Sequence, residues 1–232
     1  MENKRANERG NVMFYILIAV ALMAALIFAV GQSGRGSIQG VNQEKARILA
    51  SEIIDYSNTI ATAYAQLRLR GCKLAEMSFE NTVDLNYTNA GAPADKSCHL
   101  FELAGGGITF KLPPVEALTG VGKQMITGEL EIEEVGTTCA ATTCAELLLA
   151  SGPFTKTVCD QINTRLKVNE EGDATPIDAA EFMTRDEFVG AMNFEANIGT
   201  APTAGAIFRK TAACLQDSDD TFYYFYKILA TN

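Results

Sequence analysis

The feature that most constrains this chain is an uninterrupted apolar run from Val12 to Val30, which follows a short charged leader. A helix of about 19 residues at about 1.5 Å per residue measures roughly 28 Å, close to the hydrocarbon thickness of a bilayer. A secretory signal peptide has a shorter apolar core, of roughly 7 to 15 residues, although Ala29-Val30-Gly31 matches the small residues of a cleavage site. We therefore expect a retained transmembrane helix segment over residues 11–30 rather than a cleaved signal.

Charge and cysteine content predict that the rest of the chain is exported. The leader, residues 1–10, has Lys4, Arg5 and Arg9 against two glutamates, which favours a cytoplasmic N-terminus under the positive-inside rule. All six cysteines lie between Cys72 and Cys214, and an even number fits disulfides in an oxidising exterior compartment. The pattern is that of a single-pass protein whose remaining residues lie on one side of a bilayer.

The exported part is acidic. After residue 70 the chain has 11 Lys and Arg against 23 Asp and Glu, which argues against binding to nucleic acid phosphates or to an anionic lipid surface. Residues 71–232 are enough for one hydrophobic core, and we expect a single globular head.

A glycine-rich stretch and an amphipathic helix follow the apolar run. Residues 31–40 contain four glycines and predict a hinge or a locally melted stretch. Residues 41–70 have apolar positions at spacings of three, four and seven, ending at Arg68, Arg70 and Gly71, which suit a helix C-terminus. We expect this stripe to pack on the sheet of the head over its outer half and on neighbouring subunits elsewhere, through Ile48, Ile53, Tyr56, Ile60 and Leu67.

Beyond Gly71 the pattern changes to alternation. Residues 109–112, 125–135, 146–150, 206–210 and 221–229 predict strands, the second and third as one hairpin and the last two as another. Residues 154–167 and 176–192 predict short helices. The expected fold is α+β, a long N-terminal transmembrane and amphipathic helix packed on an antiparallel β-sheet head.

The leader ending in Arg9-Gly10, the apolar run that begins at Asn11-Val12 and the amphipathic continuation to Leu69 together resemble type IV pilins and type II secretion pseudopilins. The resemblance covers about the first 70 residues and, more loosely, the strands and late cysteines of the head. It implies cleavage after Gly10 by a prepilin peptidase, N-methylation of Asn11 and assembly with other pilin-like subunits. It also implies a bacterial inner-membrane location with a periplasmic or extracellular head.

Two positions depart from the family pattern. Family members begin with Phe or Met and have Glu as the fifth mature residue, whereas this chain has Asn11 and Tyr15. That glutamate neutralises the terminal amine of a neighbouring subunit, and some tip-located minor pseudopilins lack it. The chain therefore resembles a minor or divergent filament subunit. The alternative, a membrane-anchored exported binding protein that does not polymerise, remains open: Tyr15 favours it, whereas the stripe favours a filament.

The head has few candidate catalytic residues and none of the common catalytic motifs, so we expect neither enzyme activity nor a cofactor. The single histidine, His99, adjoins Cys98, for which a structural disulfide is the favoured interpretation over a Cys/His pair. Aromatic residues 222–226 are best explained by core packing, and Glu129, Glu131, Glu133 and Glu134 by the solvated face of a strand.

An acidic turn near the C-terminus is the one candidate metal site. Asp217, Asp219 and Asp220 offer the several oxygens that Ca²⁺ requires, and the pseudopilin resemblance adds to this reading. A solvated turn is nevertheless favoured over a calcium site.

Six cysteines allow 15 pairings. Cys139 and Cys144 flank the tip of the predicted hairpin and can approach within disulfide distance. Cys72 and Cys98 would tie the loop after the long helix to the helix end, which leaves Cys159 for Cys214. Exchanging Cys98 and Cys159 as partners is nearly as reasonable.

Overall fold

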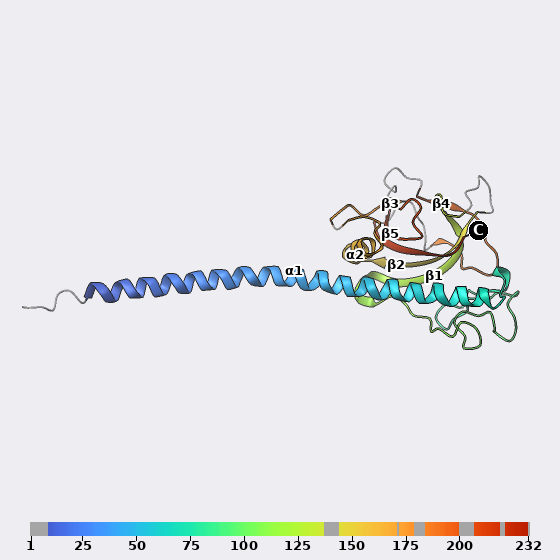
Figure 1. The fold of residues 1–232 in the computed structure, drawn as a ribbon, viewed down its shortest axis with the longest axis horizontal. Coiled ribbons are helices and arrows are strands. Elements are labelled where there is room, and N and C mark those ends of the chain that lie inside the picture. The colour runs from blue at the N-terminus through green and yellow to red at the C-terminus, as the bar shows by residue number, and fades with distance from the viewer. Residues whose placement is uncertain are drawn as a thin grey trace, which may run out of the picture. The chain divides into compact units, whose positions relative to one another are not determined.

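The computed structural model describes residues 9–136, 144–170, 172–178, 184–199, 207–218 and 221–231, with side chains from residue 13 onward except those of residues 29–41. The chain divides into two compact units, Met1–Lys45 and Ala46–Asn232. The helix α1 (Arg9–Leu69) begins in the first unit and ends in the second (Figure 1).

The backbone of α1 is helical along all of its 61 residues, including residues 31–40, where the glycines predicted a hinge. Glycine lowers helix stability by up to about 1 kcal/mol per residue, but extending a helix adds one hydrogen bond per residue, so a few glycines need not break it. The predicted C-terminus is confirmed. Gly71 adopts φ +97° and the Cys72 N–H donates to the Leu67 carbonyl, 3.1 Å away, which closes the last turn.

The second unit contains a six-stranded sheet with the order β3-β5-β6-β2-β1-β4. Three antiparallel pairs, β1 with β2, β2 with β6 and β5 with β6, form its centre. At its two edges β4 pairs with β1 and β3 pairs with β5 in parallel. The strands are β1 (Leu118–Ile132), β2 (Glu146–Phe154), β3 (Ile177–Asp178), β4 (Ala196–Ile198), β5 (Ala212–Asp217) and β6 (Tyr223–Ala230).

The predicted fold class is therefore wrong. The head sheet is mixed rather than antiparallel. Its edge strands, β3 and β4, are short segments that return after longer connections and run parallel to β5 and β1. The β1/β2 hairpin was anticipated, with Met125 paired to Ala150 and Ile126 to Leu149. The strand that precedes β6 in its terminal hairpin is β5, which begins just after the segment predicted for it, residues 206–210.

Two local predictions fail because side chains and backbone form tertiary contacts instead. The described parts of residues 176–192 contain β3 and turns rather than a helix, and the Phe188 N–H donates to the Ile126 carbonyl of β1. Residues 109–112 form no strand, since the Thr109 carbonyl and the Lys111 N–H both bond the hydroxyl of Tyr56. The helix predicted over residues 154–167 is confirmed as α2 (Lys156–Leu166). The described residues also form the 3₁₀ helices η1 (Leu74–Glu76) and η2 (Val115–Ala117).

Both faces of the sheet are covered. On one face, the part of α1 from Ala46 to Leu67 packs against strands β1, β2, β5 and β6, together with α2, as Figure 1 shows for its cyan end beside β1 and β2. On the other face Leu148 of β2 and Tyr226 of β6 pack with Ile198 and Ile207. Burial on both faces explains why the sequence of β2 is a continuous apolar run rather than an alternation of apolar and polar residues.

Among the residues whose side chains are described, none of the helices combines the length and the apolar character that a membrane crossing requires. The described side chains of the apolar run cover residues 13–28, roughly 24 Å of helix against a hydrocarbon core of about 30 Å. This finding contradicts the transmembrane segment predicted for residues 11–30, the single-pass topology and the inner-membrane location with an exported head.

Candidate functional site

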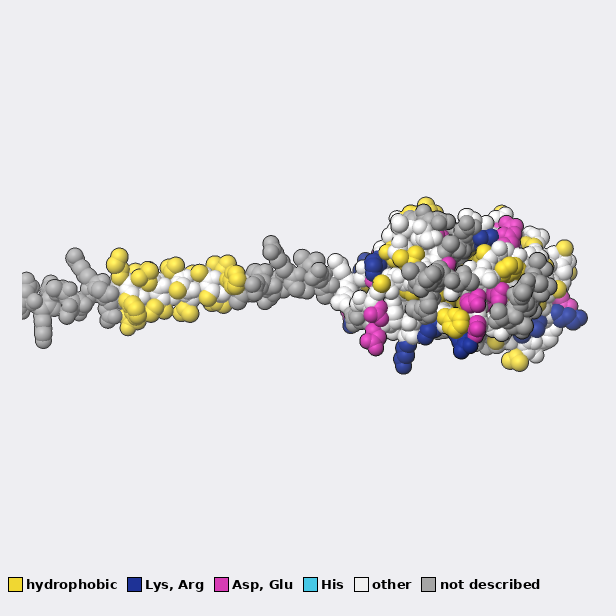
Figure 2. All heavy atoms as spheres, turned by 90° about the horizontal axis from the view of Figure 1, so that it is seen from above, with side chains coloured by type: hydrophobic (Ala, Val, Ile, Leu, Met, Phe, Trp, Pro, Cys, Tyr) yellow, Lys and Arg dark blue, Asp and Glu magenta, His cyan; other side chains and the backbone are white. Residues whose placement is uncertain are grey.

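The first unit presents apolar side chains on every side of a helix. Side chains of residues 13–28 of α1 are all exposed, and the large apolar ones have exposed fractions from 40% at Ile18 to 72% at Met13. Figure 2 shows them as a yellow stretch without a charged atom. A helix that is apolar all round is normally buried, so residues 13–28, called here the apolar segment, form a candidate contact surface.

The stripe residues predicted to contact other subunits lie mostly in the chain's own core. Ile53, Ile60 and Leu67 have exposed fractions of 6%, 0% and 0% against the sheet and its surroundings, and Tyr56 is half-buried. Only Ile48, with an exposed fraction of 61%, remains available to another molecule. The packing on the sheet was thus anticipated, but four of the five positions contribute to folding rather than to assembly.

The predicted processing site, Gly10 and Asn11, lies in the first turn of α1, which begins at Arg9. Its side chains lie outside the described residues, and cleavage there stays a prediction.

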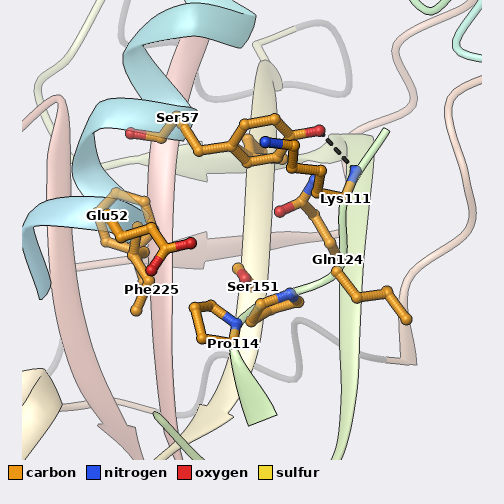
Figure 3. Close-up of a pocket in the computed structure, with 12 residues that line it drawn as sticks. Glu52, Ser57, Lys111, Pro114, Gln124, Ser151 and Phe225 are labelled. Carbon is orange, nitrogen blue, oxygen red and sulfur yellow. Dashed lines mark hydrogen bonds between the residues drawn. The ribbon is translucent and has the colours of Figure 1, made fainter. Parts of the chain in front are cut away.

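The second unit has a pocket between α1 and the sheet, with a cavity volume of about 60 Å³. Its walls come from α1, from the segment 111–114, and from strands β1, β2 and β6 (Figure 3). The lining residues are Glu52, Ile53, Tyr56, Ser57, Lys111, Leu112, Pro113, Pro114, Gln124, Leu149, Ser151 and Phe225. In Figure 3 Gln124 enters from β1 and Glu52 lies on the opposite side.

Tyr56 joins α1 to the segment that closes this pocket. Its hydroxyl donates to the Thr109 carbonyl at 2.9 Å and accepts from the Lys111 N–H at 2.8 Å, the bond drawn in Figure 3. The Lys111 ammonium lies 5.9 Å from the centre of the Tyr56 ring, within cation–π range. Burial raises the pKa of the Tyr56 hydroxyl, and the hydrogen bond from Lys111 opposes that rise. The two hydrogen bonds and the cation–π contact therefore attach the segment around Lys111 to α1.

Gln124 is the unusual group in the pocket. Its exposed fraction is 4%, and its Nε2 atom makes no hydrogen bond of acceptable geometry within the described residues. The amide lies close enough to the Tyr56 hydroxyl to lower the pKa of that group slightly, against the larger effect of burial. An unsatisfied buried amide hydrogen costs about 1–3 kcal/mol, so an acceptor in the adjoining cavity would stabilise this group.

The acidic residues of β1 do not form the solvated face that their alternation predicted. Glu129 and Glu131 have exposed fractions of 7% and 1%, whereas Glu133 is half-buried and Glu134 exposed. Glu129 is contacted by the segment before β4, and Glu131 pairs with Asn197 of β4. The Asp186 N–H donates to Glu129 at 2.9 Å, while burial raises the pKa of that carboxyl.

Glu146, at the start of β2, is also fully buried. Its Oε2 accepts from the Ile132 N–H at 2.8 Å, and Oε1 has no hydrogen-bond partner in the described part of the chain. Burial raises the pKa of this carboxyl to about 7, the hydrogen bond opposes the rise, and the Glu131 carboxylate adds to it. In the sequence this group is visible only as an acid at the start of an apolar run.

The structure separates His99 from any thiol chemistry. The adjoining Cys98 forms a disulfide with Cys72, and Nδ1 of His99 lies 3.5 Å from a carboxylate oxygen of Glu80. The histidine is buried, with an exposed fraction of 6%. This arrangement excludes a Cys98/His99 nucleophile pair.

The disulfides Cys72–Cys98 and Cys159–Cys214 are confirmed. Cys144 is disulfide-bonded as well, and its predicted partner, Cys139, lies outside the described residues.

Asp217 is buried at the end of β5, whereas Asp219 and Asp220 lie outside the described residues. Among the described residues no three metal-ligating side chains come together. The aromatic run, by contrast, packs as expected: Tyr224, Phe225 and Tyr226 are buried.

Comparison with known proteins adds no assignment: no family model, curated protein or solved structure matches this chain.

Proposed function

We propose that this chain is a structural subunit of a pilin-like filament, of a minor or divergent kind, in which the apolar segments of several copies pack together. The observation that carries the proposal is the exposure of the apolar segment on all sides of α1. Residues 13–28 contain no charge, so water is a poor environment for any face of this helix.

Copies of the same helix are suitable partners for this surface. Alanines at positions 19, 21, 24 and 25 lie between the larger side chains, and alternating small and large residues let helices approach and interdigitate. Burial of a large apolar side chain contributes about 1.5–3 kcal/mol, so a few such residues per interface are enough to hold subunits together.

The resemblance to pilins supports the same proposal, and Tyr15 in place of the family's glutamate supports a minor or divergent subunit. In a filament core an unpartnered terminal amine would cost several kcal/mol, which a subunit without neighbours above it avoids.

A charge in the apolar segment tests the proposal. Full-length Leu22→Glu should lose the large assemblies that electron microscopy and sedimentation detect in the wild type, because each copy would bury an unpaired carboxylate. The matched control is Val121→Glu, since Val121 has an exposed fraction of 94% in the second unit and Leu22 one of 61%. Assemblies that persist in Leu22→Glu, or a wild type that stays monomeric, would refute the proposal.

Processing is tested separately by mass spectrometry of the mature N-terminus. We expect Asn11 as the first residue. A protein that begins at Met1 or near Gln32 would contradict cleavage by a prepilin peptidase, whatever its state of assembly.

A further inference from the structure

The pocket between α1 and the sheet combines three properties that constrain what it can bind. Its deep wall is apolar, formed by Ile53, Leu149 and Phe225, of which Ile53 has an exposed fraction of 6% and the other two 1% each. Pro113 and Pro114 also line the pocket and have no backbone N–H to offer a ligand. Most of a ligand's surface would therefore meet carbon atoms.

One buried donor points to a ligand with an acceptor. Nε2 of Gln124 is almost entirely buried and makes no hydrogen bond of acceptable geometry within the described residues. The Tyr56 hydroxyl beside it already bonds Thr109 and Lys111. Another buried polar group of the lining, Ser57, already donates from Oγ to the Ile54 carbonyl at 2.7 Å. An acceptor placed against Gln124 would satisfy a group that is costly to leave unpaired.

The charges at the mouth of the pocket and the volume of the cavity further restrict the class of ligand. Glu52 and Lys111 are exposed and of opposite sign, so the mouth favours neither anions nor cations, and burial of a charge beyond it would be costly. The cavity of about 60 Å³ is smaller than the about 150 Å³ that accommodates a benzene ring, so a six-atom ligand would fill it and extend to its exposed mouth.

We propose that this pocket binds a small uncharged molecule of about six non-hydrogen atoms, apolar except for one carbonyl or hydroxyl oxygen that accepts a hydrogen bond from Gln124. The site is built entirely within the second unit. The inference does not depend on filament formation.

Two probes of the same shape test the proposal on the full-length protein. Cyclopentanone has the acceptor, and methylenecyclopentane replaces its oxygen with a CH₂ group. Methyl-detected NMR should show saturable shifts at Ile53 and Leu149, with the ketone binding about tenfold tighter than the hydrocarbon, as one hydrogen bond of about 1.4 kcal/mol predicts.

Gln124→Met keeps the length of the side chain and removes the amide, so the ketone should lose its advantage while both probes still bind. Gln216→Met is the control, because Gln216 lies on β5 and does not line the pocket. If Gln124→Met fails to fold, the comparison of the two probes on the wild type still decides.

Three results would overturn the proposal: equal affinity for the two probes, shifts away from the lining residues, or no saturable binding. A fourth would also do so. If assembly alone shifts Ile53 and Leu149 and blocks the ketone, a side chain of another copy occupies the pocket.

Discussion

Residues 13–28 and residues 46–67 belong to the same helix, yet their apolar side chains lie in opposite environments. In the first stretch apolar residues occupy every face and are exposed, whereas in the second they form one stripe that the sheet covers. Ile60 is completely buried, whereas Leu22 has an exposed fraction of 61%. Contacts within the chain thus stabilise residues 46–67, whereas the apolar side chains of residues 13–28 stay exposed.

The largest effect should come from charging the covered stripe. Ile60→Asp would bury an unpaired carboxylate between α1 and the sheet, which costs about 3–5 kcal/mol or more, a large part of a typical domain stability of about 5–15 kcal/mol. The measurement is chemical denaturation followed by near-UV circular dichroism.

The matched control for that variant is Ile48→Asp, on the same helix but with an exposed fraction of 61%. It should change the free energy of unfolding by less than about 1 kcal/mol. If the two variants are equally stable, the distinction between the covered and uncovered parts of α1 fails.

Next in size is the removal of the disulfide between α2 and β5. Cys159 and Cys214 are separated by 55 positions in the sequence, and the chain-entropy estimate for such a loop is about 4 kcal/mol. The double alanine variant should lower the urea midpoint more than the equivalent change at Cys72 and Cys98, separated by 26 positions. A reversed order would show that residual structure in the unfolded chain, rather than loop length, sets the effect.

The buried carboxyl of Glu146 predicts a stability that depends on pH. The pKa of the carboxyl is about 7 in the folded protein against 4.5 unperturbed, so folding favours the neutral form. The free energy of unfolding should therefore fall as pH rises from about 4.5 to about 7, by on the order of 3 kcal/mol.

Glu146→Gln should remove most of this pH dependence and stabilise the protein above pH 7, since the amide can still accept from the Ile132 N–H. Glu116→Gln is the control at an exposed position. A wild type that is equally stable at pH 5 and pH 8, or a variant that keeps the full slope, would remove the argument for a buried neutral acid.

The smallest effect should come from the uncovered part of the helix. Leu26, with an exposed fraction of 64%, contributes nothing to the core of the second unit, so Leu26→Glu should change the free energy of unfolding of that unit by less than about 0.5 kcal/mol. Denaturation monitored by tyrosine fluorescence measures it. A loss of several kcal/mol would show that the two units stabilise each other.

The sequence predicted those features that depend on local pattern. The stripe from Ile53 to Leu67, the helix end at Gly71 and the hairpin of β1 and β2 follow from periodicity and turn residues. The pairing of Cys159 with Cys214 is the one left once the other two pairs are assigned. Each of these is decided by residues close in sequence or by a small set of combinations.

What could not be predicted depends on segments that return from far along the chain. The alternation of apolar and polar residues predicts that Glu129 lies on a solvated face of its strand. In the structure Asp186 and the segment after it approach Glu129 and bury it. The parallel edges of the sheet arise in the same way. Gln124 gave no signal either, since a glutamine in a strand is recognised as unpaired only when its neighbours are placed.

Both edges of the sheet end in very short strands, and this limits how the protein can associate. β3 has two residues and β4 three, too few to offer an incoming chain a ladder of backbone hydrogen bonds. Strand addition and amyloid-like stacking are thereby disfavoured at these edges, as in natural proteins that protect their sheets from aggregation. A filament of the kind proposed above would therefore use the helical apolar segment rather than β3 or β4.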